Sequence, residues 1–131
     1  MNYTAIKTTI SEAEHILFKN FNIIGTATEL PGEVDFNFKI KVDNEDRYIL
    51  KISRPGEDEN YLDFQQKLLQ YVAENGPQII APKVILDTNN HAISEIKDHQ
   101  GNLRKVRLLT WVSGRIWSSV NPQLDNLRFS L

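Results

Sequence analysis

The sequence contains no cysteine among its 131 residues. Disulfide scaffolds, thiolate zinc sites and catalysis by a thiol are therefore excluded. An excess of one charge is also missing, because 15 Lys and Arg residues stand against 17 Asp and Glu residues, and a general nucleic-acid binder would be more basic. No apolar run approaches the roughly 18 residues of a membrane span, and the N-terminus lacks the apolar core of a signal peptide. We expect a soluble, cytoplasmic protein with no nucleic-acid or membrane partner.

The length and composition fit one globular domain, or part of a larger one. Hydrophobic residues make up 40% of the chain and charged residues 24%, which is close to the globular average and argues against a disordered chain. A chain of 131 residues is long enough to bury a single hydrophobic core. We find no internal repeat and no coiled-coil heptad in it.

Hydrophobic periodicity and turn residues predict the order helix, three strands, helix and about three further strands. Ser11 and Glu14 fit a capping box, which marks the start of the first helix. This order indicates an α+β fold, in which a mainly antiparallel sheet of about five strands is joined by an N-terminal helix and crossed by a second helix. The predicted helices span 11–20 and 58–75, and the predicted strands span 22–28, 36–42, 47–53, 83–87, 92–97 and 103–112.

Side chains alternate most clearly in the hairpin predicted from the second and third strands. The apolar faces are predicted to carry Phe36, Phe38, Ile40 and Val42 in the first strand of the hairpin, and Tyr48, Leu50 and Ile52 in the other. The same alternation places Ile49 and Lys51 together on the opposite face of the second hairpin strand.

The predicted helix over 58–75 carries an apolar stripe at helical spacing. Gly76 followed by Pro77 is typical of a helix end, because glycine favours the C-cap and proline cannot continue the helix. The stripe consists of Tyr61, Gln65, Leu68 and Val72, and is widened by Leu62, Leu69 and Tyr71.

Lys51 is the first candidate for chemistry, because it lies in the middle of an apolar strand. A cation on a strand is often only a solvated residue, and the functional interpretation needs an anion such as a phosphate on that face. The loop before the hairpin adds a second feature, since a strand–turn–strand flap followed by a strand lysine covers nucleotide phosphates in kinases. This loop has one glycine, Gly32, and lacks Gly-x-Gly-x-x-Gly, so by itself it is as typical of an ordinary hairpin.

Cations are concentrated towards the end of the chain. Residues 97–115 include Lys97, Arg104, Lys105, Arg107 and Arg115, against Asp98 as the one acid. Such a cluster is compatible with an anion site. Strand alternation splits these side chains between two faces, however, and we favour a solvated sheet edge.

Taken in order, these motifs resemble a known family. The motifs are Leu-x-Gly-Glu-x-Asp-x-Asn-Phe at 30–38, Tyr-Ile-Leu-Lys-Ile at 48–52, Ala-Pro-Lys-Val at 81–84 and Arg-Leu-Leu-Thr-Trp-Val-Ser-Gly-Arg at 107–115. Together they resemble the N-terminal lobe of aminoglycoside phosphotransferase-like small-molecule kinases. The last motif is most similar to the branch of hydroxylysine kinases and of phosphotransferase domains fused to class III aminotransferases. The resemblance covers residues 10–117. It implies a protein-kinase-like fold, with 1–112 as the ATP-binding N-lobe and 113–131 as interlobe linker and start of a C-terminal lobe.

The resemblance also implies roles for individual residues. Lys51 would contact the α- and β-phosphates of ATP, and Ile49 would lie under the adenine. Either Gln65 or Asp63 of the helix would partner Lys51, with Gln65 slightly favoured. The flap over the phosphates would consist of Gly32, Glu33, Val34, Asp35, Phe36 and Asn37. Thr110, Trp111 and Val112 would link the two lobes, with the Thr110 carbonyl and the Val112 N–H at the adenine edge.

The function implied is transfer of phosphate from ATP to a hydroxyl of a small, amine-bearing acceptor, with Mg²⁺ as the metal. The catalytic loop of such kinases, His-x-Asp-x-x-x-x-Asn, does not occur in the sequence. We therefore expect no catalytic residue and no metal ligand in this chain, and no activity of the chain alone. We also expect self-association through an apolar patch made of Trp111, Val112, Ile116, Trp117 and Val120. The alternative is a non-catalytic α+β domain that binds a ligand or a partner.

Overall fold

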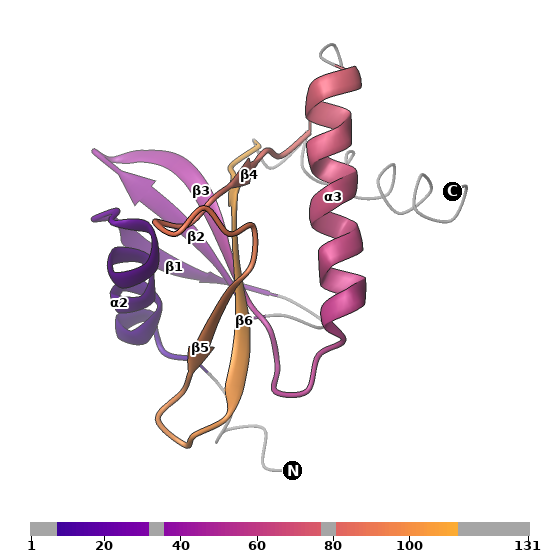
Figure 1. The fold of residues 1–131 in the computed structure, drawn as a ribbon. Coiled ribbons are helices and arrows are strands. Elements are labelled where there is room, and N and C mark those ends of the chain that lie inside the picture. The colour runs from indigo at the N-terminus through magenta and orange to yellow at the C-terminus, as the bar shows by residue number, and fades with distance from the viewer. Residues whose placement is uncertain (1–7, 32–35, 77–80, 113–131) are drawn as a thin grey trace.

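The structure is a computed structural model that describes residues 8–31, 36–76 and 81–112. In this part of the chain, two helices lie on opposite sides of a central sheet (Figure 1). The helices are α2 (Ile10–Phe21) and α3 (Glu59–Asn75). The strands are β1 (Thr26–Leu30), β2 (Phe36–Val42), β3 (Glu45–Ile52), β4 (Val84–Ile85), β5 (Ser94–Lys97) and β6 (Leu103–Thr110).

The described strands form one six-stranded sheet with the order β1-β2-β3-β6-β4, and β5 also pairs with β6. All pairs are antiparallel. The predicted α+β fold with a mainly antiparallel sheet is thus confirmed. Strand β6 lies inside the sheet, because β3 pairs with one edge of it while β4 and β5 share the other.

Helix α2 begins at Ile10, one residue earlier than the sequence predicted, and its N-cap lies two residues earlier than predicted. Its N-cap is Thr9, whose hydroxyl accepts the N–H of Glu12 over 3.1 Å, while the Glu12 carboxylate accepts the Thr9 N–H over 3.2 Å. The prediction of Ser11 as the cap was wrong, although Ser11 and Glu14 have the same spacing. Glu14 instead accepts the N–H of Ala27 over 2.8 Å and so ties α2 to β1.

The first predicted strand was placed about four residues too early. Asn22 is the C-cap of α2 with φ of 57°, and β1 begins only at Thr26. The intervening apolar residues suggested a strand, yet Ile24 is 80% exposed. The loop ends at Gly25, where a Cβ would lie 2.8 Å from Ile40 and 2.9 Å from the Lys41 carbonyl oxygen. Only glycine fits this close approach of the chain to β2.

The β2–β3 hairpin has the predicted alternation. Phe36, Phe38 and Ile40 of β2 are buried, as are Leu50 and Ile52 of β3. These side chains form the main core together with α2 and with alternate residues of β6. The members contributed by α2 and β6 are Ala13, Ile16, Leu17, Phe21, Val106 and Leu108.

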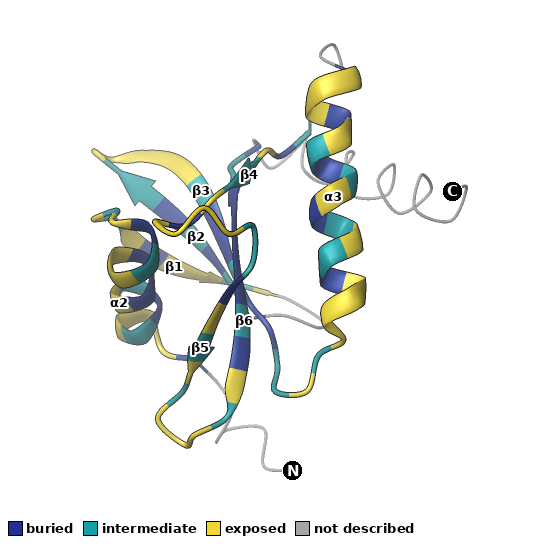
Figure 2. Ribbon diagram, viewed as in Figure 1, coloured by how far each residue is buried: buried dark blue, intermediate teal, exposed yellow. Residues whose placement is uncertain are grey.

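Helix α3 buries only part of the predicted stripe. The buried residues are Leu62, Gln66, Leu69 and Val72, while Tyr61 is 38% and Tyr71 63% exposed. Figure 2 shows this narrow buried stripe with exposed residues on the outer side of α3. The helix bounds and the end at Gly76 agree with the prediction. Neither described helix has the length and apolar character needed to cross a membrane.

The cations of β6 are not on a solvated sheet edge, and that prediction was wrong. Arg104 is 2% exposed and Arg107 is 4% exposed, because β6 is flanked by strands on both sides. The two arginines lie on opposite faces. Arg104 lies on the α2 side, where its guanidinium is 5.3 Å from the Phe36 ring and its Nε donates to the Ser53 carbonyl over 2.5 Å. Arg107 lies on the α3 side.

Candidate nucleotide site

The sheet face toward α3 carries a small apolar cluster. Ile49 of β3 and Leu109 of β6 are each 2% exposed and pack with Leu69 of α3. Ile49 and Leu109 are also paired directly across the two strands. Leu30, Val84 and Trp111 pack around this centre. The cluster is separate from the main core, which lies on the other face of the sheet.

A row of polar side chains crosses the same face next to the apolar cluster. The strand register pairs Asn37 with Lys51, and Lys51 with Arg107, across β2, β3 and β6. Because side chains alternate along a strand, this row points to the same side as Ile49. Lys51 Nζ donates to Asn37 Oδ1 over 3.1 Å. The face therefore combines an apolar surface with a half-buried ammonium group beside it.

Helix α3 contributes Gln65 to this row. Arg107 Nη1 donates to Gln65 Oε1 over 2.7 Å, which connects α3 to β6. The other helix residue considered as a partner of Lys51, Asp63, forms an ion pair of 2.9 Å with Lys67 one turn along the helix. Of the two, Gln65 is the one that reaches the polar row.

The segment after β6 is fixed by backbone contacts. The N–H of Thr110 donates to the Lys83 carbonyl over 2.9 Å, and the Thr110 hydroxyl accepts the Lys83 N–H over 2.8 Å. The N–H of Trp111 donates to the Arg47 carbonyl over 2.8 Å. Val112 is 8% exposed and Trp111 is partly buried. The Thr110 carbonyl and the Val112 N–H, expected at an adenine edge, are not used in these contacts.

The predicted flap is described only in part. Gly32, Glu33, Val34 and Asp35 lie outside the described residues. Asn37 belongs to the polar row. Phe36 is 7% exposed and packs in the main core on the α2 side, so its side chain lies on the face away from Lys51. Residues 113–131, expected to start a second lobe, also lie outside the described part, as do three of the five residues of the expected apolar patch, Ile116, Trp117 and Val120.

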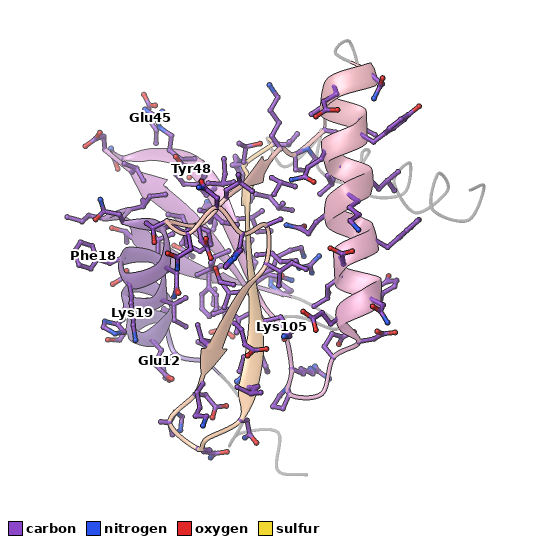
Figure 3. All side chains as sticks on the ribbon, in the orientation of Figure 1. Glu12, Phe18, Lys19, Glu45, Tyr48 and Lys105 are labelled. Carbon is purple, nitrogen blue, oxygen red and sulfur yellow. The ribbon has the colours of Figure 1, made fainter. Side chains whose placement is uncertain are left out.

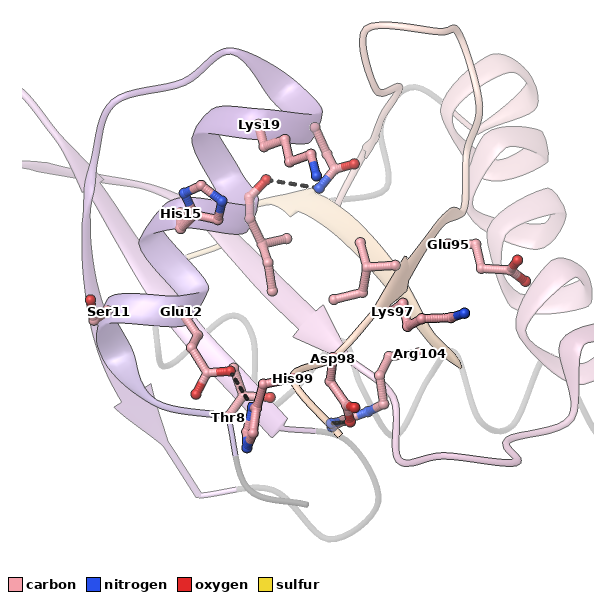
Figure 4. A pocket seen from close by; sticks show the side chains of 13 residues that line it. Thr8, Ser11, Glu12, His15, Lys19, Glu95, Lys97, Asp98, His99 and Arg104 are labelled. Carbon is pink, nitrogen blue, oxygen red and sulfur yellow. Dashed lines mark hydrogen bonds and ion pairs between the residues drawn. The ribbon is translucent and has the colours of Figure 1, made fainter. Parts of the chain in front are cut away.

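A hollow lies on the α2 side, between α2 and the β5–β6 hairpin (Figure 4). Two pairs of its charged side chains are in contact. His99 is 3.3 Å from Glu12, and Asp98 is 3.2 Å from Arg104. Burial alone would raise the pKa of Asp98, but hydrogen bonds from the Asn102 and Gln100 N–H groups and from Arg104 outweigh it and lower the pKa. These pairings favour a structural role for Glu12, His99, Asp98 and Arg104.

No metal centre is evident within residues 8–31, 36–76 and 81–112. In this part of the chain, no three His, Asp or Glu side chains come together in a way that would hold a metal ion. The polar row has one ammonium, one guanidinium and two amides, which are groups that suit an anion rather than a cation.

Comparison with known proteins identifies the family. The family model APH, described as the phosphotransferase enzyme family, matches residues 26–131. The matched region contains the whole polar row and the apolar cluster. The chain belongs to this family. No curated protein sequence matches this phosphotransferase-family chain.

Two solved structures share the fold of this member of the phosphotransferase family. The microcompartment-associated aminopropanol kinase superposes with a TM-score of 0.67 at 13% identity, over 81% of this chain and 32% of that one. The amicoumacin kinase hAmiN, in complex with AMP-PNP, Ca²⁺ and Ami, gives a TM-score of 0.56 at 20% identity, over 67% of this chain and 26% of that one. The chain thus has a kinase-like N-lobe fold and spans a third or less of these two kinases.

Arg107 is the residue of this phosphotransferase-family site that the sequence did not single out. The sequence pattern grouped Arg107 with the cations of a solvated sheet edge. Its position beside Lys51 depends on the pairing of β6 with β3, which the local sequence does not show. Alternation along 103–112 is the signal that could have found it, since it puts Arg107 and Leu109 on one face. The order of the strands in the sheet could not be derived from the local sequence patterns.

Proposed function

We propose that the chain forms the ATP-binding lobe of a small-molecule kinase. The proposal depends above all on one observation, which is that Lys51 stands beside the apolar cluster of Ile49 and Leu109 in a chain of the phosphotransferase family. An apolar surface suits a planar base, and a compact ammonium suits a phosphate as a point charge. A fold shared with two small-molecule kinases supports the same function.

In this proposal the adenine lies against Ile49, and the Thr110 carbonyl and Val112 N–H bond its edge. The phosphates lie at Lys51, beside Asn37. The flap residues Gly32, Glu33, Val34 and Asp35 cover the phosphates, with the two carboxylates turned outward because they would repel a polyphosphate.

The acceptor proposed is a small molecule with an amine and a hydroxyl. A structural neighbour named for aminopropanol, which has both groups, supports this class of acceptor.

We expect Mg²⁺ to be the metal, which would neutralise charge on the transferred phosphate. Since the sequence has no His-x-Asp-x-x-x-x-Asn motif, catalytic base and metal ligands would come from outside this chain. The chain alone is expected to be inactive, and its self-association and cytoplasmic location stay predictions.

The test is an ATP-dependent phosphorylation assay with the natural, full-length protein and a panel of amino alcohols, followed by mass spectrometry of the products. We expect transfer of one phosphoryl group to a hydroxyl. Lys51→Ala should lower turnover about a hundredfold or more, because positioned charge carries most of phosphoryl-transfer catalysis. The free energy of unfolding should change by less than about 1 kcal/mol, since Lys51 is only half buried.

The matched control is Lys67→Ala, which removes a lysine that is 73% exposed on α3. This variant should keep wild-type turnover. Wild-type turnover in Lys51→Ala would contradict the assigned role of the lysine. Absence of phosphoryl transfer to every acceptor, with or without Mg²⁺, would favour a non-catalytic binding domain.

A further inference from the structure

A lysine of β2 contacts the tryptophan that follows β6. Lys39 pairs with Ile49 across the β2–β3 hairpin, and its Nζ lies 5.7 Å from the centre of the Trp111 ring. Strand β3 lies between β2 and β6, so this contact bridges two strand spacings of about 4.8 Å each. The Lys39 side chain is 25% exposed. A cation within about 6 Å of a tryptophan ring is attracted by the electrons of the ring, which holds the two side chains together.

A bulge in β3 gives Lys39 a counter-ion. The register of β3 against β2 shifts by one residue at Arg47, and beyond the shift Asp46 pairs with Lys41. Such a bulge turns the neighbouring side chain to the other face of its strand, which brings Asp46 to the face of Lys39. Asp46 Oδ1 lies 3.6 Å from Lys39 Nζ. In Figure 3, the label Tyr48 marks this end of β3. The charge of Lys39 is therefore balanced by a carboxylate.

Trp111 is held from three directions. Its backbone N–H donates to the Arg47 carbonyl over 2.8 Å, which fixes the main chain beside β3. Its side chain is partly buried and packs against the apolar cluster that contains Ile49 and Leu109. Lys39 adds a contact from the β2 side. Because packing covers only part of the side chain, the lysine helps to decide the orientation of the ring.

Three rows of side chains follow one another along the sheet face toward α3. The first is the polar row with Lys51, the second holds Ile49 and Leu109, and the third contains Trp111. Successive rows on one face are two residues apart, which is about 7 Å. With the phosphates at Lys51 and the base against Ile49, the Trp111 ring lies beyond the far end of the base. A purine has two fused rings and extends further toward Trp111 than a pyrimidine does.

We propose that the Trp111 ring closes the base end of the nucleotide site and makes the site prefer purines, and that Lys39 is the positioning residue that holds this ring. This inference rests on the proposed nucleotide site. Lys39 acts through Trp111 and not through its charge on the phosphates, because Asp46 lies beside its ammonium group. Loss of Lys39 therefore weakens binding of a base that touches the ring and leaves binding of a shorter base unchanged.

The experiment measures dissociation constants for ATP and CTP by calorimetry, on the natural, full-length protein. The two nucleotides carry the same triphosphate, so the ratio of their affinities reports on the base alone. We expect the wild type to bind ATP about tenfold more tightly than CTP. Lys39→Met keeps most of the stem and removes the charge. It should weaken ATP binding about fivefold, the usual size of a partly buried cation–π contact, and leave CTP binding within about twofold. Lys39→Arg should keep the wild-type ratio, because arginine also stacks on aromatic rings.

Two further variants separate the role of Lys39 from a general effect of charge. The matched control is Lys41→Met, which removes the next lysine on the same face of β2 and should bind both nucleotides as the wild type does. Trp111→Leu removes the ring. In that background Lys39→Met should change the ATP-to-CTP ratio no further, because the two side chains act as one unit.

Several outcomes overturn the proposal. These are equal losses of ATP and CTP binding in Lys39→Met, a loss in Lys39→Arg or Lys41→Met as large as in Lys39→Met, or the same effect of Lys39→Met with and without the Trp111 ring. If Trp111→Leu fails to fold, the ratio in Lys39→Met and its rescue in Lys39→Arg decide. A wild-type protein that binds neither nucleotide would reject the proposed function itself. Tight binding of ATP and CTP alike by the wild type would reject only the roles of Trp111 and Lys39.

Discussion

At the scale of single residues, the start of α2 depends on which of two hydroxyls caps the helix. Thr9 and Ser11 are each followed three residues later by a glutamate. Thr9 makes both bonds of the capping box with Glu12, whereas Glu14 binds the Ala27 N–H. The sequence pattern cannot separate the two, because the choice depends on where β1 passes α2.

This difference gives a paired test. Thr9→Ala should lower the free energy of unfolding by about 1 kcal/mol, because it removes the cap of a helix that packs on the main core. Ser11→Ala should change it by less than about 0.5 kcal/mol, since Ser11 is exposed. Urea unfolding of both variants is the measurement. A larger loss in Ser11→Ala than in Thr9→Ala would contradict the assigned cap.

The residues of the candidate site were predictable to different degrees. Lys51 and Ile49 share a face of β3, as their alternation predicted. The contact between Gln65 and Arg107 was not predictable. It needs both the pairing of β6 with β3 and the rotation of α3, and neither is local to the sequence around these residues.

At the scale of elements, the connection from β4 to β5 is organised by one carboxylate. Asp87 accepts the Ser94 hydroxyl over 2.6 Å and the N–H groups of Asn89 and His91 over 2.8 and 2.9 Å. Burial alone would raise the pKa of Asp87, but these hydrogen bonds outweigh it and lower the pKa. The ionised carboxylate therefore holds this turn together.

The lowered pKa predicts how the contribution of Asp87 depends on pH. The folded protein binds the Asp87 proton less readily than the unfolded chain, whose pKa is about 3.9, so the stabilisation is complete above that value. It is lost as the pH falls from about 4 through the lower folded value. Asp87→Asn should cost about 1 to 3 kcal/mol at pH 7. The cost should shrink at pH 3, as measured by urea unfolding, and an equal cost at both pH values would contradict this account.

The accuracy of the predicted elements follows the clarity of their patterns. The β2–β3 hairpin alternates strictly and was predicted well. Helix α3 was predicted with bounds correct to within one residue but with too wide a buried stripe, because apolar side chains occur on two sides of it. Tyr61 and Phe64 are 38% and 40% exposed, while Leu62 and Leu69 face the sheet. Helical spacing admits all of these side chains, and only packing against the sheet separates the buried ones from the exposed ones.

At the scale of the whole molecule, the sheet order creates the candidate site. Strand β6 follows β5 in the chain but lies between β3 and β4, which brings Arg107 beside Lys51 and Leu109 beside Ile49. Apart from β1, which was placed about four residues too early, the strands were predictable from local patterns, whereas their order results from long-range pairing. The same order explains why the arginines of β6 are buried and not at a solvated edge.

The central claim is that ATP binds on the sheet face toward α3. The most direct measurement is a crystal structure of the natural, full-length protein with a non-hydrolysable ATP analogue. We predict that the adenine lies against Ile49 and Leu109, and that a phosphate oxygen lies within about 4 Å of Lys51 Nζ, the usual ion-pair distance. A nucleotide bound instead in the hollow between α2 and the β5–β6 hairpin, with Lys51 distant from every phosphate, would contradict the claim.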